Sequence, residues 1–396
     1  MMQVYADNAA TTKMSKKSFE TTVSYMENEY GNPSSLYTIG QKAQEALVSA
    51  RESIAGNLGC EPREITFTSG GSEADNQAIV SAAEIGIKKG KKHIISTEFE
   101  HHAVLHTLDK LKKRGFEITL LPVHSDGLVR VGELSKAIRP DTVLVTIMFA
   151  NNEIGTLQPI AEIGKLCKEK GVIFHTDAVQ AVGHVKVNVK ELNIDMLSMS
   201  AHKFHGPKGA GLLYARKGIL LSSIIEGGAQ ERGKRAGTEN VPAIVGMAAA
   251  FTESCENMDA NYQYVKGLRD ILIDELSKIP HSKINGSVEK RLPGNVNICF
   301  EGIEGESLLL LLDDKGVSAS SGSACTSGSL DPSHVLLALG LPHEIAHGSL
   351  RLSLSEYNTE EEVKHIIKVV PEVVEYLRSM SPVWKDLKEG RKEYVI

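Results

Sequence analysis

The 396-residue sequence has few cysteines, no excess of positive charge and no long apolar run. Its five cysteines, at positions 60, 167, 255, 299 and 325, form no C-x-x-C pair that would indicate a zinc or redox motif. Such a sparse, odd-numbered set fits a reducing cytosol. The net charge of −6 argues against a constitutive nucleic-acid or anionic-membrane binder.

A membrane helix needs about 18 consecutive apolar residues, and no segment approaches that length. The N-terminal MMQVYADNAATT has neither the basic nor the apolar region of an export signal. We therefore expect a soluble, cytoplasmic protein. Hydrophobic residues make up 41% and charged residues 24%, which is typical of globular chains, and the length predicts two or three domains.

Short β-branched runs alternate with longer segments of helical periodicity over the first half of the chain. This alternation predicts an α/β fold with a mostly parallel, doubly wound sheet, whose ligands lie beyond the carboxyl ends of the strands. The seven predicted strands are residues 65–69, 93–98, 117–123, 142–150, 172–178, 196–201 and 209–216.

The rhythm changes after the loop at 227–240, which predicts a smaller α+β domain at the C-terminus. Its last helix is predicted over 359–377, with Thr359 as N-cap. We divide the chain into an N-terminal arm, 1–15, that packs with the small domain, a large domain, 16–258, and the small domain, 259–396. The polar tail after Pro382 is a second candidate arm.

Lys203 follows a predicted strand in the sequence SAHKFHGPKG, 200–209. A lysine in such a turn can be held close to a carbonyl cofactor and lose its proton. A lone lysine in a polar loop is more often a surface residue. Lys208 is the rival lysine, although it immediately precedes the next strand.

Other strand ends carry polar residues that can face the same cleft. Asp177 lies at the end of one predicted strand, with Gln180 three residues on, and a buried carboxylate there would need a cationic or N–H partner. Gly70 and Gly71 precede Ser72 at the start of a helix, a pattern that binds phosphate, although Ser72 could equally be a plain N-cap.

His101 and Asn152 follow two further strands of the predicted sheet. The His101 ring could stack on a flat cofactor and act as an acid or base, and Asn152 could bond to a ring oxygen. Each of these residues alone is more typical of an ordinary polar loop than of a ligand contact. Polar clusters at five strand ends of one sheet together favour a ligand site.

With these residues in place, the sequence resembles the fold-type I pyridoxal-phosphate enzymes of the class V aminotransferase superfamily, and specifically the NifS/IscS-type (group I) cysteine desulfurases. The resemblance covers nearly the whole chain. It is carried by YADNAATT (5–12), GNPSS (31–35), TSGGSEADN, EHHAV, NNEIG, HTDAVQ, SAHKFHGPKG, RAGTEN, SSGSACTSG and the R-x-S at 351–353.

The resemblance implies a role for each site residue. Lys203 forms the Schiff base with pyridoxal 5'-phosphate, and His101 stacks on its ring as a further catalytic residue. Asp177 pairs with the pyridine nitrogen, Gln180 contacts the ring hydroxyl, and Asn152 lies beside cofactor and substrate. The phosphate is held by Ser72, Ser200 and His202, together with Thr238 from the other subunit of a homodimer.

Cys325 lies in a run at 318–329 in which eight of twelve residues are Gly or Ser. By itself such a run is more typical of a linker that happens to contain a cysteine. Beside the pyridoxal site it predicts a mobile loop that carries a nucleophilic thiol, whose reactive form is the thiolate. Arg351 lies in the alternating strand SLRLSLS, where its guanidinium could clamp an amino-acid carboxylate or form a surface ion pair.

The implied activity converts L-cysteine to L-alanine and leaves a persulfide on Cys325. The resemblance implies an acceptor such as a NifU/IscU-type iron–sulfur scaffold or a tRNA-thiolation relay. No intrinsic metal is expected, apart from a nascent iron–sulfur cluster that Cys325 could share with such a scaffold. Rival readings are a class V aminotransferase, a kynureninase-like hydrolase, a selenocysteine lyase and a cofactor-free, metal-binding scaffold.

Three positions depart from the family pattern. Ser72 stands where many members carry Thr, which preserves the hydroxyl. Tyr37 replaces a His often found nearby, and Ala201 replaces a frequent Gly. Neither of the last two removes a group to which a role is assigned above.

Overall fold

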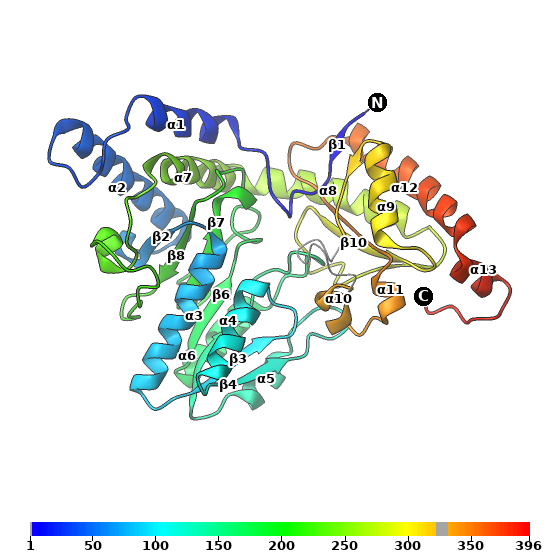
Figure 1. The fold of residues 1–396 in the computed structure, drawn as a ribbon, viewed down its shortest axis with the longest axis horizontal. Helices are drawn as coiled ribbons and strands as arrows, with labels where there is room; N and C mark the ends of the chain where they lie inside the picture. Colours follow the sequence, from blue (N-terminus) through cyan, green and yellow to red (C-terminus); the bar gives the residue numbers. More distant parts are fainter. Residues whose placement is uncertain (1, 322–331) are drawn as a thin grey trace.

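The computed structural model describes residues 2–321 and 332–396. A seven-stranded sheet forms the larger part, in the order β2-β8-β7-β6-β5-β3-β4 (Figure 1). Neighbouring strands from β4 to β7 are parallel, and β8 runs antiparallel to both its neighbours. The strands are β2 (Ile65–Thr68), β3 (His93–Thr97), β4 (Glu117–Leu121), β5 (Thr142–Thr146), β6 (Ile173–Asp177), β7 (Met196–Ser200) and β8 (Gly211–Ala215). The predicted mostly parallel seven-stranded sheet is confirmed.

Helices cover both faces of this sheet, so the strands are buried on two sides. Leu144 and Val145 of β5 are neighbours in sequence and enter opposite cores, because successive strand residues point to opposite faces. The helical elements of this part are α1 (Lys16–Glu27), α2 (Thr38–Leu58), η1 (Pro62–Glu64), α3 (Gly71–Lys88), α4 (His102–Lys113), α5 (Val131–Ala137), α6 (Ile160–Lys170), η2 (Ala201–Lys203), η3 (Gln230–Gly233) and α7 (Val241–Glu256).

The smaller part is built on a three-stranded antiparallel sheet, in the order β12-β10-β9. A separate apolar core joins it to α8, α9 and α12. Its elements are α8 (Met258–Leu276), β9 (Ser282–Ile284), β10 (Asn295–Phe300), α9 (Gly305–Asp314), β11 (Val317–Ser318), α10 (His334–Ala338), α11 (His343–Ala346), β12 (Ser349–Ser353), α12 (Glu360–Met380) and α13 (Pro382–Lys388).

Both chain ends dock on the smaller part. The Thr359 side chain caps α12 by accepting from the Glu362 backbone N–H, as predicted. The tail after Pro382 forms α13, and the Glu301 carboxylate accepts the backbone N–H groups of Val395 and Ile396. The sequence boundaries of the two domains stay a prediction.

The N-terminal segment, residues 4–12, crosses from the small sheet to the large one (Figure 1). It begins as β1 (Val4–Tyr5), which pairs in parallel with β11. The Asn8 N–H then donates to the Ser353 carbonyl, and the Thr12 N–H donates to the His202 carbonyl. This segment therefore lies along the junction of the two sheets.

None of the helices in the described ranges is long and apolar enough to cross a membrane.

Candidate active site

Polar residues collect at one edge of the large sheet. Asp177 is the last residue of β6, and Ser200 is the last residue of β7. Lys203 follows in the short helix η2, while His101 and Asn152 lie in the turns that follow β3 and β5. Because the carboxyl ends of parallel strands meet at one edge, the topology brings these residues to the same side of the sheet, as predicted.

Asp177 is a buried carboxyl group, 6% exposed. It accepts a hydrogen bond from the Val179 backbone N–H at 2.9 Å. Burial raises the pKa of Asp177, and His101 and Lys203 act in the opposite direction. A carboxylate in such a dry position is stabilised when a cation faces it, and a protonated ring nitrogen is a cation of the right kind.

The Lys203 amine is held by the N-terminal segment. Its Nζ donates to the carbonyls of Ala9 and Ala10 at 2.6 and 2.7 Å. The His184 ring donates from Nε2 to the Lys203 backbone carbonyl at 2.8 Å, which fixes the main chain of the turn. Lys208, the alternative lysine, is exposed.

The start of α3 lies close to the end of β7, and its first backbone N–H groups have no side-chain cap. Gly70 is the N-cap, and no side chain caps the helix. A Cβ added at Gly71 would lie 2.5 Å from Val179 Cγ2, and one added at Gly70 would lie 3.6 Å from Ser200 Oγ. Gly71 lets α3 begin close against Val179, and Gly70 faces the Ser200 hydroxyl, so backbone N–H groups and hydroxyls, with Ser72 in the first helical turn, lie together as an anion cradle needs.

His202, two residues after Ser200, contacts the N-terminal segment. Its Nδ1 lies 3.1 Å from Thr11 Oγ1. Burial, together with the charges of Lys203 and Lys208, lowers the pKa of His202 to about 4. The ring is therefore neutral near pH 7.

His101 caps α4 through its side chain. Nδ1 accepts the Ala103 backbone N–H at 3.1 Å, so the ring proton of the neutral form is on Nε2. Gln180 donates from Nε2 to the Ala9 carbonyl at 3.0 Å, which is also an acceptor for the Lys203 amine. The Gln180 amide and the Lys203 amine therefore share the Ala9 carbonyl oxygen as an acceptor.

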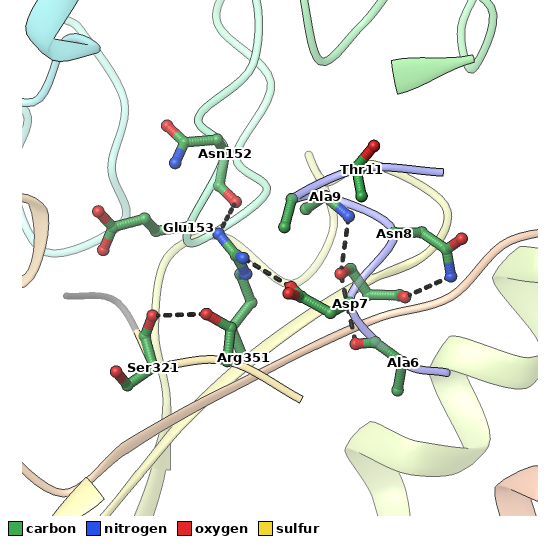
Figure 2. A network of polar contacts seen from close by, with 12 residues as sticks. Ala6, Asp7, Asn8, Ala9, Thr11, Asn152, Glu153, Ser321 and Arg351 are labelled. Carbon is green, nitrogen blue, oxygen red and sulfur yellow. Dashed lines mark hydrogen bonds and ion pairs between the residues drawn. The ribbon is translucent and has the colours of Figure 1, made fainter. Parts of the chain in front are cut away.

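Arg351 enters the site from β12 of the small sheet and is 3% exposed. Figure 2 shows its guanidinium between Asp7 and Asn152. Nη2 donates to Asp7 Oδ1 at 2.7 Å and Nη1 to the Asn152 carbonyl at 3.2 Å. The two predicted substrate-binding residues are thus in contact, through the main chain of Asn152.

The sequence reasoning assigned no role to Asp7, Ala9, Ala10 or His184. Asp7, Ala9 and Ala10 lie in the motif YADNAATT, which contributed only to the resemblance. Backbone carbonyls leave no signal in the residue type, so only the path of the chain shows that Ala9 and Ala10 hold the lysine. Asp7 lies between Ala6 and Asn8, and nothing in this local pattern marks it as a partner of Arg351.

The remaining predicted residues are Thr238 and Cys325. Thr238 is exposed in the loop before α7. Cys325 lies outside the described residues. The other four cysteines are free thiols, and burial raises the pKa of Cys60, Cys167 and Cys299 to about 12 and that of Cys255 to about 11.

The edge of the sheet fits pyridoxal 5'-phosphate. The buried Asp177 carboxyl suits a protonated ring nitrogen, the uncapped start of α3 suits a phosphate, and the Lys203 amine suits the cofactor aldehyde. Within residues 2–321 and 332–396, no cluster of His, Cys, Asp and Glu side chains could hold a metal ion.

Comparison with known proteins is consistent with this arrangement. The family model of class-V aminotransferases matches residues 4–366. The cysteine desulfurase IscS of Methanosarcina thermophila is 56% identical over 380 residues, which cover 96% of this chain and 94% of that protein. The IscS of Clostridium botulinum (strain Hall) is 52% identical over 394 residues, 99% of each chain.

The solved structure of a NifS-like protein superimposes with a TM-score of 0.89 at 40% identity, and covers 95% of this chain and 100% of that one. The family match over most of the chain and the near full-length relatives agree with the geometry at the sheet edge. The chain therefore belongs to the class-V aminotransferase family, within its cysteine desulfurase branch.

Proposed function

We propose that this protein is a pyridoxal-phosphate-dependent cysteine desulfurase that converts L-cysteine to L-alanine and delivers the sulfur for iron–sulfur cluster assembly or other thio-cofactors. One observation carries the proposal: Asp177, Lys203 and Arg351 converge where the N-terminal segment crosses between the sheets. An amine, a buried carboxyl group and a guanidinium at one junction suit a cofactor and an amino acid together.

When bound, pyridoxal phosphate supplies an electron sink for the electron pair left at the substrate α-carbon. The negative charge of Asp177 keeps the ring nitrogen protonated, and His101 stacks on the ring. Ser72, Ser200 and His202 hold the phosphate with Thr238 of a second subunit. Gln180 and Asn152 contact the ring substituents and the substrate.

Lys203 anchors the cofactor and then carries the proton. Its amine takes the proton from the α-carbon of the substrate and is held at the Ala9 and Ala10 carbonyls while protonated. Arg351 binds the substrate carboxylate through paired N–H donors, which fixes the α-carbon relative to Lys203.

Cys325 is the sulfur acceptor. Its thiol loses a proton and attacks the substrate sulfur, so that an S–S bond forms as the carbon–sulfur bond of the substrate breaks. The carbon that loses sulfur takes up a proton, which gives L-alanine and a persulfide on Cys325. The raised pKa values of the other four thiols support this choice, because a nucleophilic cysteine must ionise.

The proposal extends to partners. Large apolar side chains at Phe19, Met26, Tyr30, Leu36 and Tyr37 are exposed, Leu36 to 90%, which favours a homodimer that buries this stretch. The acceptor of the persulfide is a NifU/IscU-type scaffold, with which Cys325 could share a nascent cluster. A cytoplasmic location remains our expectation.

The experiment compares purified protein before and after L-cysteine is added, with cofactor absorbance and L-alanine measured together. Cys325→Ala should keep the cofactor band and lose turnover, whereas Cys255→Ala, the matched control on α7, should keep both. Alanine and sulfide formed by Cys325→Ala at the wild-type rate would show that the nucleophile is wrong.

A further inference from the structure

Arg351 is held in place by two other parts of the chain. Asp7 of the N-terminal segment accepts from Nη2 at 2.7 Å, and the Asn152 carbonyl of the turn after β5 accepts from Nη1 at 3.2 Å (Figure 2). The Asp7 side chain is 20% exposed and Arg351 3%. The ion pair is therefore sheltered, and solvent ions screen it only weakly.

One N–H donor of the Arg351 guanidinium, Nε, takes no part in these contacts. Its Nε is buried, and no hydrogen-bond partner for it is present in the described part of the chain. A buried N–H without a partner is unfavourable, so this position favours an incoming acceptor. A carboxylate is the acceptor whose geometry best matches a guanidinium.

The charges at this point are nearly balanced before any substrate binds. Asp7 offsets the positive charge of Arg351, and Glu153, next to Asn152, adds a second carboxyl group. Burial raises the pKa of Glu153 to about 7, which keeps much of it protonated at neutral pH. One substrate carboxylate can share the several donors of the guanidinium with Asp7, but a second anionic group would meet repulsion from Asp7.

We propose that Asp7 is a positioning and specificity residue for the amino-acid substrate: it aims the Arg351 guanidinium, and its negative charge disfavours amino acids that carry a second carboxylate or another anionic group. The proposal rests on the proposed function, because it takes Arg351 as the group that binds the substrate carboxylate. L-Cysteine carries no second carboxylate, whereas L-aspartate does.

The test uses the holoenzyme of Asp7→Asn, titrated with L-alanine and with L-aspartate while the absorbance of the bound cofactor is followed. Asparagine still accepts a hydrogen bond from Arg351 but carries no charge. We expect affinity for L-alanine to rise about tenfold, and affinity for L-aspartate to rise by a larger factor. KM for L-cysteine should fall without a rise in kcat. If the role of Asp7 were purely structural, the variant would instead bind both amino acids more weakly.

The matched control is Asp109→Asn, which removes the same charge from the surface of α4, where the Asp109 side chain is 60% exposed. Its affinities should stay within about twofold of wild type. The proposal would be overturned if Asp109→Asn gained the same affinity. It would also be overturned if the L-alanine affinity of Asp7→Asn were unchanged or weaker. If Asp7→Asn does not fold, Asp7→Ser is titrated with the same expected direction.

Arg351→Gln distinguishes the proposed role of Arg351 from that of Asp7. If this variant binds L-alanine as wild type does, the role of Arg351 in the proposed function is wrong. If it loses affinity while Asp7→Asn shows no gain, only the role of Asp7 is wrong.

Discussion

At the carboxyl edge of the seven-stranded sheet, Asp177 is the last residue of β6 and Lys203 follows β7, whereas Arg351 lies in the middle of β12 in the three-stranded sheet. The first two are held by main-chain atoms: Asp177 by the Val179 N–H, Lys203 by two carbonyls. Arg351 instead depends on the charged side chain of Asp7, together with one carbonyl.

From this difference we assign Asp177 and Lys203 to the chemical step and Arg351 to substrate binding. A main-chain support is fixed by the path of the backbone and cannot be removed by exchanging a side chain. A support made by a carboxylate carries charge, so it can tune how strongly an anion binds. We therefore expect substitutions at the large sheet to act mainly on kcat and substitutions around Arg351 to act mainly on KM.

Asp177→Asn should have the largest effect. Asparagine can accept the Val179 N–H but has no negative charge for the ring nitrogen, so turnover should fall about a thousandfold. The measurement is L-alanine formation from saturating L-cysteine. Asp141→Asn, directly before β5 at the opposite edge of the sheet, is the control and should turn over normally. A variant at 177 that retains most of its activity would break the comparison.

Arg351→Lys should act on binding. Lysine keeps the positive charge but loses the planar fork of donors, so KM for L-cysteine should rise about fiftyfold with a smaller change in kcat. Steady-state kinetics over a range of cysteine concentrations give both constants. A fall in kcat at constant KM would place Arg351 with the chemistry instead.

Glu153→Gln should change the pH dependence of stability by a smaller amount. The pKa of Glu153 is raised from 4.5 to about 7, mainly by burial. The folded state thus holds this proton more tightly than the unfolded state, and the stability it contributes below pH 4.5 is lost as pH rises toward 7. Urea unfolding should show the variant gaining about 2 kcal/mol relative to wild type between pH 5 and pH 7.

The control for this prediction is Glu162→Gln, at an exposed position in the first turn of α6. It should follow the wild-type profile at both pH values. If Glu162→Gln gave the same relative gain, the effect would belong to net charge rather than to the buried Glu153.

Much of the fold could be predicted from local patterns. The seven strands follow from short β-branched runs, and the Thr359 cap follows from a polar residue before acidic ones. The strand predicted over 142–150 ends earlier, at Thr146: the Phe149 N–H still bonds to the Asp177 carbonyl of β6, but the Met148 N–H donates to the Glu100 carboxylate instead of to a strand. Periodicity cannot show where an apolar run leaves the ladder of the sheet.

The site was predictable only in part. Asp177 stands out as a polar residue at the end of a buried strand, and Lys203 as one that follows a buried strand. The docking of the C-terminal tail on Glu301 was not predictable, because it depends on a partner about 94 residues away in the chain. The same holds for the Asp7–Arg351 pair, whose members are 344 residues apart.

The amino-acid order alone determined the strand and helix pattern, the sheet edge that carries the polar residues, and the position of Lys203 after a buried strand, because each depends on neighbours along the chain. The tertiary structure decided which charges face each other. The crossing of the N-terminal segment between two sheets sets the Lys203 amine against Ala9 and Ala10 and the Arg351 guanidinium against Asp7. Such contacts arise only when burial brings distant segments together, since Coulomb energy depends on distance in space and on the surrounding medium.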